Sequence, residues 1–121
     1  MDYMLMFYES TDDQACQNDE RAGDYWAGWM AYIGAMQQAG IMKAGEGLQP
    51  PAMATTLRGA GSRRRVQDGP YADTKEQLGC FVVLDLPSLD AALDWAARAP
   101  CAANGAIEVR PVMPPPDGLP G

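Results

Sequence analysis

The order of predicted elements indicates an α+β fold, a ferredoxin-like βαββαβ arrangement with an inserted β-hairpin and an antiparallel sheet. Strand-like and helix-like periodicities follow one another as strand, helix, strand, hairpin, strand, helix and strand. The first strand is apolar on both faces, which is typical of a strand covered on each side. The 121 residues, 47% of them hydrophobic, suffice for one core. We therefore predict one domain over residues 1–113 and a Pro/Gly-rich tail, extended or disordered, over 114–121.

The first two elements are an apolar strand over residues 3–8 and an amphipathic helix after the polar segment 9–18. Gly40 is expected to end this helix. Three glycines within it reflect either close packing against another backbone or glycine that is merely tolerated: Gly23, Gly28 and Gly34. Apolar residues at steps of three and four predict one buried stripe. Its members are Ala22, Tyr25, Trp26, Trp29, Met30, Ile33 and Met36.

The second half of the chain supplies the hairpin, a second helix and the remaining strands. Residues 41–48 form a strand that Pro50 and Pro51 stop, and residues 55–58 and 63–67 form a hairpin around 59–62. Residues 78–86 and 106–110 are the last two strands. Ser88 can cap a helix that Pro100 ends. Its expected inward side chains are Leu89, Ala92, Leu93, Trp95 and Ala96.

Two helices can cover only one face of this sheet, yet the first strand is apolar on both. Tyr3, Leu5 and Phe7 alternate with Met4, Met6 and Tyr8. A partner subunit would bury the second face. We therefore expect a homodimer in which two sheets pack face to face into a barrel-like interface.

Composition excludes several classes of function. The net charge of -7 argues against binding of nucleic acid or of an anionic membrane surface. The basic run 63–65 alternates between strand faces, which favours a solvated edge over an anion site. No apolar window of membrane-spanning length and no secretion signal occur, so we expect a cytoplasmic protein. We expect no cofactor.

Histidine is absent and the three cysteines lie far apart, so neither a metal site nor a disulfide framework is expected. Any proton transfer is therefore left to carboxylates, lysines, tyrosines or cysteines. Cys80 is expected to be a small buried hydrophobic residue rather than a nucleophile.

A dense polar run, DGPYADTKEQLG over residues 68–79, precedes the strand 78–86. Asp68, Gly69 and Pro70 suit a turn, since the carboxylate accepts backbone N–H groups and glycine tolerates positive φ. The long polar side chains that follow lie either at the rim of the sheet or on one solvated helical turn over 74–77. As ligand-binding candidates we select Tyr71, Lys75 and Gln77.

Glu46 lies between two glycines in a predicted strand. Its carboxylate is either paired, for instance with Lys75, or unpaired in an apolar pocket as a general base. Trp26 and Trp29 belong either to the core or to a cavity that holds a flat organic molecule. The ligand-binding candidates are thus Trp26, Trp29, Glu46, Tyr71, Lys75 and Gln77, and the weak catalytic candidates are Glu46, Asp68 and Lys75.

Three motifs in order resemble the DGPF branch of the YCII-related proteins: AGEGLQPP (44–51), the run 68–79 and EVRPV (108–112). Tyr71 replaces the phenylalanine of that branch, and Cys80 stands where glycine is usual. The resemblance spans residues 2–113 and implies a dimeric α+β barrel. A histidine and an aspartate are the proposed catalytic pair of the broader family. Their positions fall near Trp29 or Met30 and at about Ala99, so this chain lacks the pair.

The resemblance and the residues leave three functional classes. The first, which we favour, is a dimer that binds a small aromatic or oxo-acid metabolite, since a few relatives act on small chlorinated aromatic compounds. The second is a lyase or isomerase in which Glu46 or Asp68 acts as base, with Lys75 or Tyr71 steadying negative charge. The third is a regulatory partner of an extracytoplasmic-function sigma factor, because genes of this branch often neighbour such factors.

Overall fold

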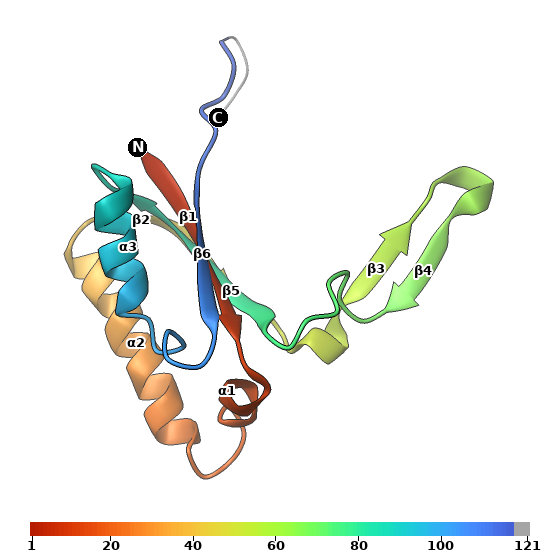
Figure 1. Cartoon of the computed structure of the whole chain (residues 1–121), viewed down its shortest axis with the longest axis horizontal. Helices are drawn as coiled ribbons and strands as arrows, with labels where there is room; N and C mark the ends of the chain where they lie inside the picture. Colours follow the sequence, from red (N-terminus) through yellow and green to blue (C-terminus); the bar gives the residue numbers. More distant parts are fainter. Residues whose placement is uncertain (118–121) are drawn as a thin grey trace.

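A computed structural model describes residues 1–117 and shows a four-stranded antiparallel sheet with two helices on one face (Figure 1). The strand order is β2-β5-β1-β6, the order of a ferredoxin-like sheet that also carries an inserted hairpin. The predicted fold class is therefore confirmed. The sheet strands are β1 (Asp2–Glu9), β2 (Met42–Gly47), β5 (Gln77–Asp85) and β6 (Ala106–Pro111), and the two helices are α2 (Ala22–Gln38) and α3 (Leu89–Ala97).

The central strand β1 divides the molecule into a packed side and an open side. Tyr3, Leu5 and Phe7 are buried beneath the helices, where Leu5 pairs with Val82 of β5 and Val109 of β6. The ring of Phe7 meets Trp29 edge to face, with ring centroids 5.3 Å apart. This aromatic contact fixes α2 against the middle of the sheet.

The opposite face of the sheet is uncovered in the single chain. Met4, Met6 and Tyr8 alternate with the buried residues of β1 and are half-buried. In the antiparallel register Met4 pairs with Val83 and Met6 with Phe81, so one apolar surface runs across the two central strands. We call this surface, with Ala44 and Glu46 of β2 and Glu108 and Arg110 of β6, the open face.

The helix α2 buries a narrower stripe than the sequence indicated. Trp29, Tyr32 and Met36 are buried, whereas Met30 is 74% exposed and Trp26 is about half exposed. Seven positions are too many for one helical face. Met30 follows Trp29 directly, so its side chain is rotated by about 100° around the helix axis, away from the sheet. The Tyr32 hydroxyl donates a hydrogen bond to the Trp95 carbonyl at 2.7 Å, which joins α2 to α3.

In α3 the prediction that Leu89 and Leu93 point inward is wrong. Ala92 and Ala96 are buried, whereas Leu89 and Leu93 are each 49% exposed. The two alanines stand four residues apart on one face, and their small side chains let the helix lie close to the sheet. The cap is as predicted, because Ser88 Oγ accepts the Ala91 N–H at 3.1 Å.

The inserted hairpin forms an arm that projects from the sheet on the side opposite α2 and α3 (Figure 1). We define the arm as residues 51–68, comprising η1 (Pro51–Met53), β3 (Thr55–Arg58), η2 (Gly61–Arg63) and β4 (Arg65–Asp68). The second strand begins two residues later than predicted because Arg63 belongs to the short helix. At the base, Gly69 has φ +98° and its N–H donates to the Ala54 carbonyl at 2.7 Å.

Residues 112–116, after the last strand, carry no helix or strand, and residues 118–121 of the predicted tail lie outside the described part of the chain. Among the helices of residues 1–117, none is long and apolar enough to cross a membrane.

The glycines of α2 are not required by close packing. A Cβ atom at Gly23 or Gly34 would meet nothing within 4 Å, and one at Gly28 would lie 3.9 Å from Pro100. Gly105 is different, because a Cβ there would overlap the carbonyl oxygen of Tyr8. The chain after α3 therefore passes β1 at a distance that only glycine permits.

We expect Gly105→Ala to lower the free energy of unfolding by about 2 kcal/mol, since backbone must move to accept the methyl group. Gly34→Ala is the control, and we expect it to raise that free energy by about 0.5–1 kcal/mol through helix propensity. Urea unfolding followed by circular dichroism measures both changes. Equal effects of the two substitutions would contradict the close approach of Gly105 to β1.

Candidate functional site

The site begins with Glu9, the one buried charged residue among residues 1–117. The alternation that buries Tyr3, Leu5 and Phe7 continues to the last residue of β1, so Glu9 points to the helix side of the sheet and is 3% exposed. The Tyr25 hydroxyl of α2 donates a short hydrogen bond to Glu9 Oε2. The Gln17 side-chain amide in turn donates to the Tyr25 hydroxyl at 3.2 Å. A buried carboxyl thus ends a short polar chain.

Gly79 makes room for this carboxyl. A Cβ atom at Gly79 would overlap Glu9 Oε1, so a side chain there would displace the acid. Gly79 closes the polar run 68–79 and lies on β5 beside β1. One residue of the motif therefore shapes the site by having no side chain.

Burial sets the protonation chemistry here. Loss of solvent around Glu9 raises its pKa; the hydrogen bond from Tyr25 opposes this rise, and the charge of Asp13 adds to it. Burial and the hydrogen bond to Glu9 also raise the pKa of Tyr25. The pKa of Cys80 and that of Cys101 rise to about 12, chiefly through burial and then through the charge of Glu9. Both thiols are therefore protonated and weakly nucleophilic at neutral pH.

Glu9 borders a cavity of about 350 Å³ between α1 (Thr11–Ala15), α2 and the segment after α3, which we call the Glu9 cavity. The rings of Tyr25 and Trp29 and the two thiols of Cys16 and Cys101 supply apolar lining, and the charged residues are mostly acidic. Its lining residues are Glu9, Asp13, Cys16, Arg21, Asp24, Tyr25, Gly28, Trp29, Pro100 and Cys101.

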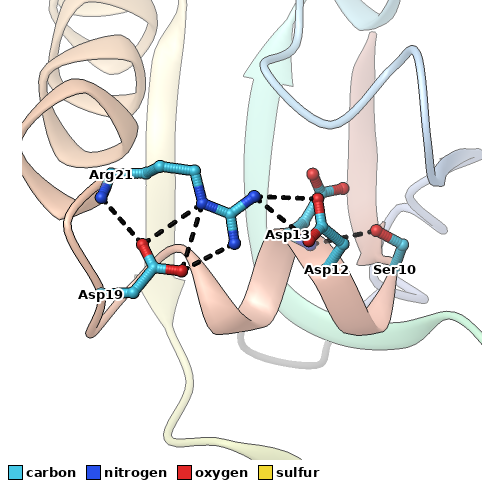
Figure 2. Close-up of polar contacts among 5 residues, drawn as sticks. All are labelled: Ser10, Asp12, Asp13, Asp19 and Arg21. Carbon is cyan, nitrogen blue, oxygen red and sulfur yellow. Dashed lines mark hydrogen bonds and ion pairs between the residues drawn. The ribbon is translucent and has the colours of Figure 1, made fainter.

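Arg21 holds together the loop beside this cavity (Figure 2). Its guanidinium donates to both carboxylate oxygens of Asp12 at 3.1 Å and to Asp19 at 2.6 Å. The hydrogen bonds from Arg21 lower the pKa of Asp19. Because two carboxylates occupy its guanidinium, this arginine is not available to neutralise Glu9.

The short helix α1 places a second acid beside Glu9. Ser10 Oγ caps the helix by accepting the Asp13 N–H at 3.1 Å (Figure 2). Within residues 1–117, the buried Oδ2 atom of Asp13 has no hydrogen-bond partner. The sequence had indicated only a polar segment here, so α1 was missed.

A second cavity, of about 290 Å³, also reaches Glu9 and is bordered by α1, Gly79 and the segment between β2 and the arm. Its lining includes the amide side chains of Gln14, Gln17 and Asn18. Glu9 therefore borders two cavities, of which the second has more amide side chains in its lining. Over the described 117 residues, no group of three His, Cys, Asp or Glu side chains could hold a metal ion.

The structure brings three of the sequence-predicted residues together elsewhere. Trp26, Trp29 and Glu46 line a third cavity, of about 250 Å³, between α2 and the edge of β2. Trp29 also lines the Glu9 cavity, so it borders both cavities.

The other predicted site residues lie at the arm and its base. Asp68 ends β4, and Tyr71 is 74% exposed beneath the Arg58 guanidinium, 4.8 Å from the ring centroid. Lys75 makes no ion pair within the described chain, so the predicted pairing of Glu46 with Lys75 does not occur there.

Gln77 stabilises the loop that joins the arm to β5. Its side-chain amide donates to the carbonyls of Thr74 and Ala72, at 2.8 and 3.0 Å. Residues 74–77 form no helical turn, so that alternative is wrong. The proposed base candidates Glu46 and Asp68 are thus on different elements, and Lys75 is paired with neither.

Glu9 and its contact with Tyr25 were missed by sequence reasoning, which placed Glu9 in a polar loop. One signal was present. Extending the alternation of the first strand by one step puts an acidic residue at a core-facing position, where a buried carboxyl needs a partner.

We expect Glu9→Gln to remove a pH-dependent loss of stability. The folded-state pKa of Glu9 is raised above 4.5. The stability that the protonated form of Glu9 contributes is therefore fully present below pH 4.5 and is lost as pH rises through the folded pKa. The variant should therefore gain stability relative to wild type, by about 1.4 kcal/mol for each pH unit between the two pKa values. Urea unfolding at intervals from pH 4 to 8 measures the difference, with exposed Glu20→Gln as control. A difference independent of pH would contradict a raised pKa.

Comparison with known proteins agrees with this fold. The chain is 38% identical over 108 residues to the uncharacterized protein R00369 of Rhizobium meliloti (strain 1021), covering 80% of this chain and 87% of that protein. A solved structure of 5-chloro-2-hydroxyhydroquinone dehydrochlorinase (TftG) from Burkholderia phenoliruptrix AC1100, in complex with 2,5-dihydroxybenzoquinone, aligns with a TM-score of 0.55. That alignment has 18% identity and covers 93% of this chain and 94% of the other, and it shows a shared fold.

The sequence profile of the YCII-related domain matches residues 1–115, almost the whole chain. The protein therefore belongs to the YCII-related family, as the three motifs indicated.

Proposed function

We propose that this protein binds a small aromatic molecule with hydroxyl or oxo groups in the Glu9 cavity. The observation that carries the proposal is the buried Glu9–Tyr25 pair at the wall of a cavity that Trp29 also lines. The aromatic rings can pack against a flat ligand, while the carboxyl can accept a hydroxyl proton or, when protonated, donate to an oxo group. A few fixed polar groups in an otherwise apolar lining are typical of ligand sites.

Charge distinguishes the two ligand classes expected from the sequence. Glu9, Asp13 and Asp24 line the cavity, and the guanidinium of Arg21 is already bound by Asp12 and Asp19. A carboxylate of an oxo acid would meet this negative field without a free cation. An uncharged phenol or quinone avoids that repulsion, so we favour the aromatic class.

The fold comparison suggests a probe. The structural neighbour TftG was solved with 2,5-dihydroxybenzoquinone, a flat ring with hydroxyl and oxo groups. The hydroxyl groups of this compound are vinylogous acids that ionise below neutral pH, so it carries charge that the acidic cavity disfavours. Hydroquinone, which is uncharged at pH 7, has the chemistry that the cavity favours. Pyruvate is the oxo-acid counterpart.

Proton transfer on the bound ligand is the second candidate function. It is supported by the position of Glu9 at the cavity wall and by the raised pKa of its carboxyl, which suits a group that both takes and gives a proton. We propose Glu9 as the acid or base instead of Glu46 and Asp68, because neither of those two residues lies in one site with Lys75.

We expect Gly28→Leu to fill the Glu9 cavity and to weaken hydroquinone binding at least tenfold. Gly28 lines that cavity, whereas the control Gly34→Leu lies on the same helix away from it. Isothermal titration calorimetry at pH 7 measures both, with pyruvate and 2,5-dihydroxybenzoquinone titrated in parallel. Absence of hydroquinone binding to the wild type, or equal losses in the two variants, would contradict the proposed site.

Glu9→Gln separates binding from proton transfer. If Glu9 only binds, the variant should change the affinity for hydroquinone and the pH dependence of that affinity. If Glu9 also transfers a proton, exchange of ring hydrogens of the bound probe with deuterated solvent, followed by NMR, should fall at least 100-fold while binding persists. Unchanged affinity and exchange in the variant would exclude Glu9 from both roles.

A further inference from the structure

The arm buries few of its own side chains within the single chain. Of the eight residues in β3 and β4, only Thr56 is partly buried, and the others are exposed. A two-stranded hairpin is at best marginally stable alone in water, and three or more strands or a packing surface are normally needed. The arm therefore has the structure of an element that packs on something outside the single chain.

The two faces of the arm differ in chemistry. Leu57 pairs with Val66 across the hairpin, and both side chains are 57% exposed. Arg58 pairs with Arg65 at the next position, so these two side chains lie on the opposite face. An exposed cross-strand apolar pair on one side of a ribbon indicates the side that docks.

The charge of the arm is opposite to that of the rest of the molecule. Residues 55–68 contain four arginines and one aspartate, a net charge of +3, in a chain whose total is -7. Two of the arginines, Arg63 and Arg64, lie at the tip. The natural complement of this tip is therefore an acidic surface such as the one the chain itself carries.

The open face provides such a surface around an apolar centre. Met6, Tyr8 and Phe81 belong to its half-buried centre, and acidic residues lie along the same registers of the strands. Of these acids, Glu46 forms no ion pair within residues 1–117. The acids that border the open face are Asp2, Glu46, Asp85 and Glu108. Asp2, Asp85 and Glu108 form ion pairs with Lys43, the Met1 amino group and Arg110, so Glu46 is the acid left for an arginine of another chain.

The arm leaves the sheet on the side of this open face, away from both helices (Figure 1). A body seated on the open face would therefore lie within the reach of the arm. Each chain carries both halves of the contact, a basic apolar arm and an acid-rimmed apolar face, which is what a twofold, self-complementary assembly requires.

We propose that the arm of each chain clasps a second copy of the same chain seated on the open face. In this assembly the Leu57–Val66 side of the arm packs on the second copy, and the arginines at its tip lie against the edge of the open face of that copy, where Glu46 is unpaired within the described chain. The arm thus contributes to the dimer contact together with the packed sheets. The proposal does not depend on ligand binding in the Glu9 cavity.

Sedimentation equilibrium of the full chain tests the clasp. We expect the double variant Arg63→Glu with Arg64→Glu, and separately Leu57→Asn with Val66→Asn, to raise the dimer dissociation constant at least tenfold. Arg98→Glu, on the helix side of the sheet, is the charge-reversal control and should leave the constant unchanged. Sodium chloride raised from 0.05 to 0.5 M should weaken the wild-type dimer, and should weaken the arginine variant less, because it lacks the screened attraction.

Phe81→Glu distinguishes the arm from the open face. If this variant is monomeric while both arm variants dimerise as tightly as wild type, the open face alone forms the dimer and the clasp is wrong. A wild-type protein that stays monomeric up to millimolar concentration would also overturn the proposal. Far-ultraviolet circular dichroism and thermal unfolding show that each variant retains its sheet, since none of the altered arm residues contributes to the core.

Discussion

The burial of alternate side chains along β1 is the constraint on which the rest of this structure depends. Because β1 pairs with β5 on one side and β6 on the other, its alternation is imposed on the whole sheet. Tyr3, Leu5 and Phe7 form the sheet side of the core, and Met4 and Met6, which alternate with them, belong to the open face. The same period of two carries Glu9 into the interior at the end of the strand.

A buried carboxyl opposes folding, and the structure compensates for it locally. The hydroxyl of Tyr25 supplies a hydrogen bond, and Gly79 leaves space where any side chain would collide with the acid. The compensation is incomplete, since burial still raises the pKa of Glu9. A group held in this state costs stability at neutral pH, and such groups are concentrated at sites of binding and proton transfer.

The polar run 68–79 serves two distant parts of the molecule. Its first residues lock the base of the arm through the positive φ of Gly69 and the contact of that residue with Ala54. Its last residue, Gly79, shapes the space around Glu9. Tyr71 and Lys75, which sequence reasoning selected for ligand binding, lie between these two ends and away from the Glu9 cavity. The motif that identifies the family therefore contributes to the site through backbone geometry more than through its polar side chains.

Periodicity and turn chemistry in the sequence determined the order of the elements, the hairpin, the Ser88 cap and the two-faced first strand, because these depend on residues near one another in the chain. The antiparallel sheet followed from that order of elements, since a βαββαβ arrangement places the strands in one antiparallel sheet. Local pattern was insufficient for the helix faces: Met30, Leu89 and Leu93 fit an apolar stripe but point away from the sheet. Only the tertiary structure decided the site. Glu9, Tyr25 and Gly79 come from three elements, and their contact depends on how α2 docks across β1 and β5, a long-range packing outcome that no local spacing encodes.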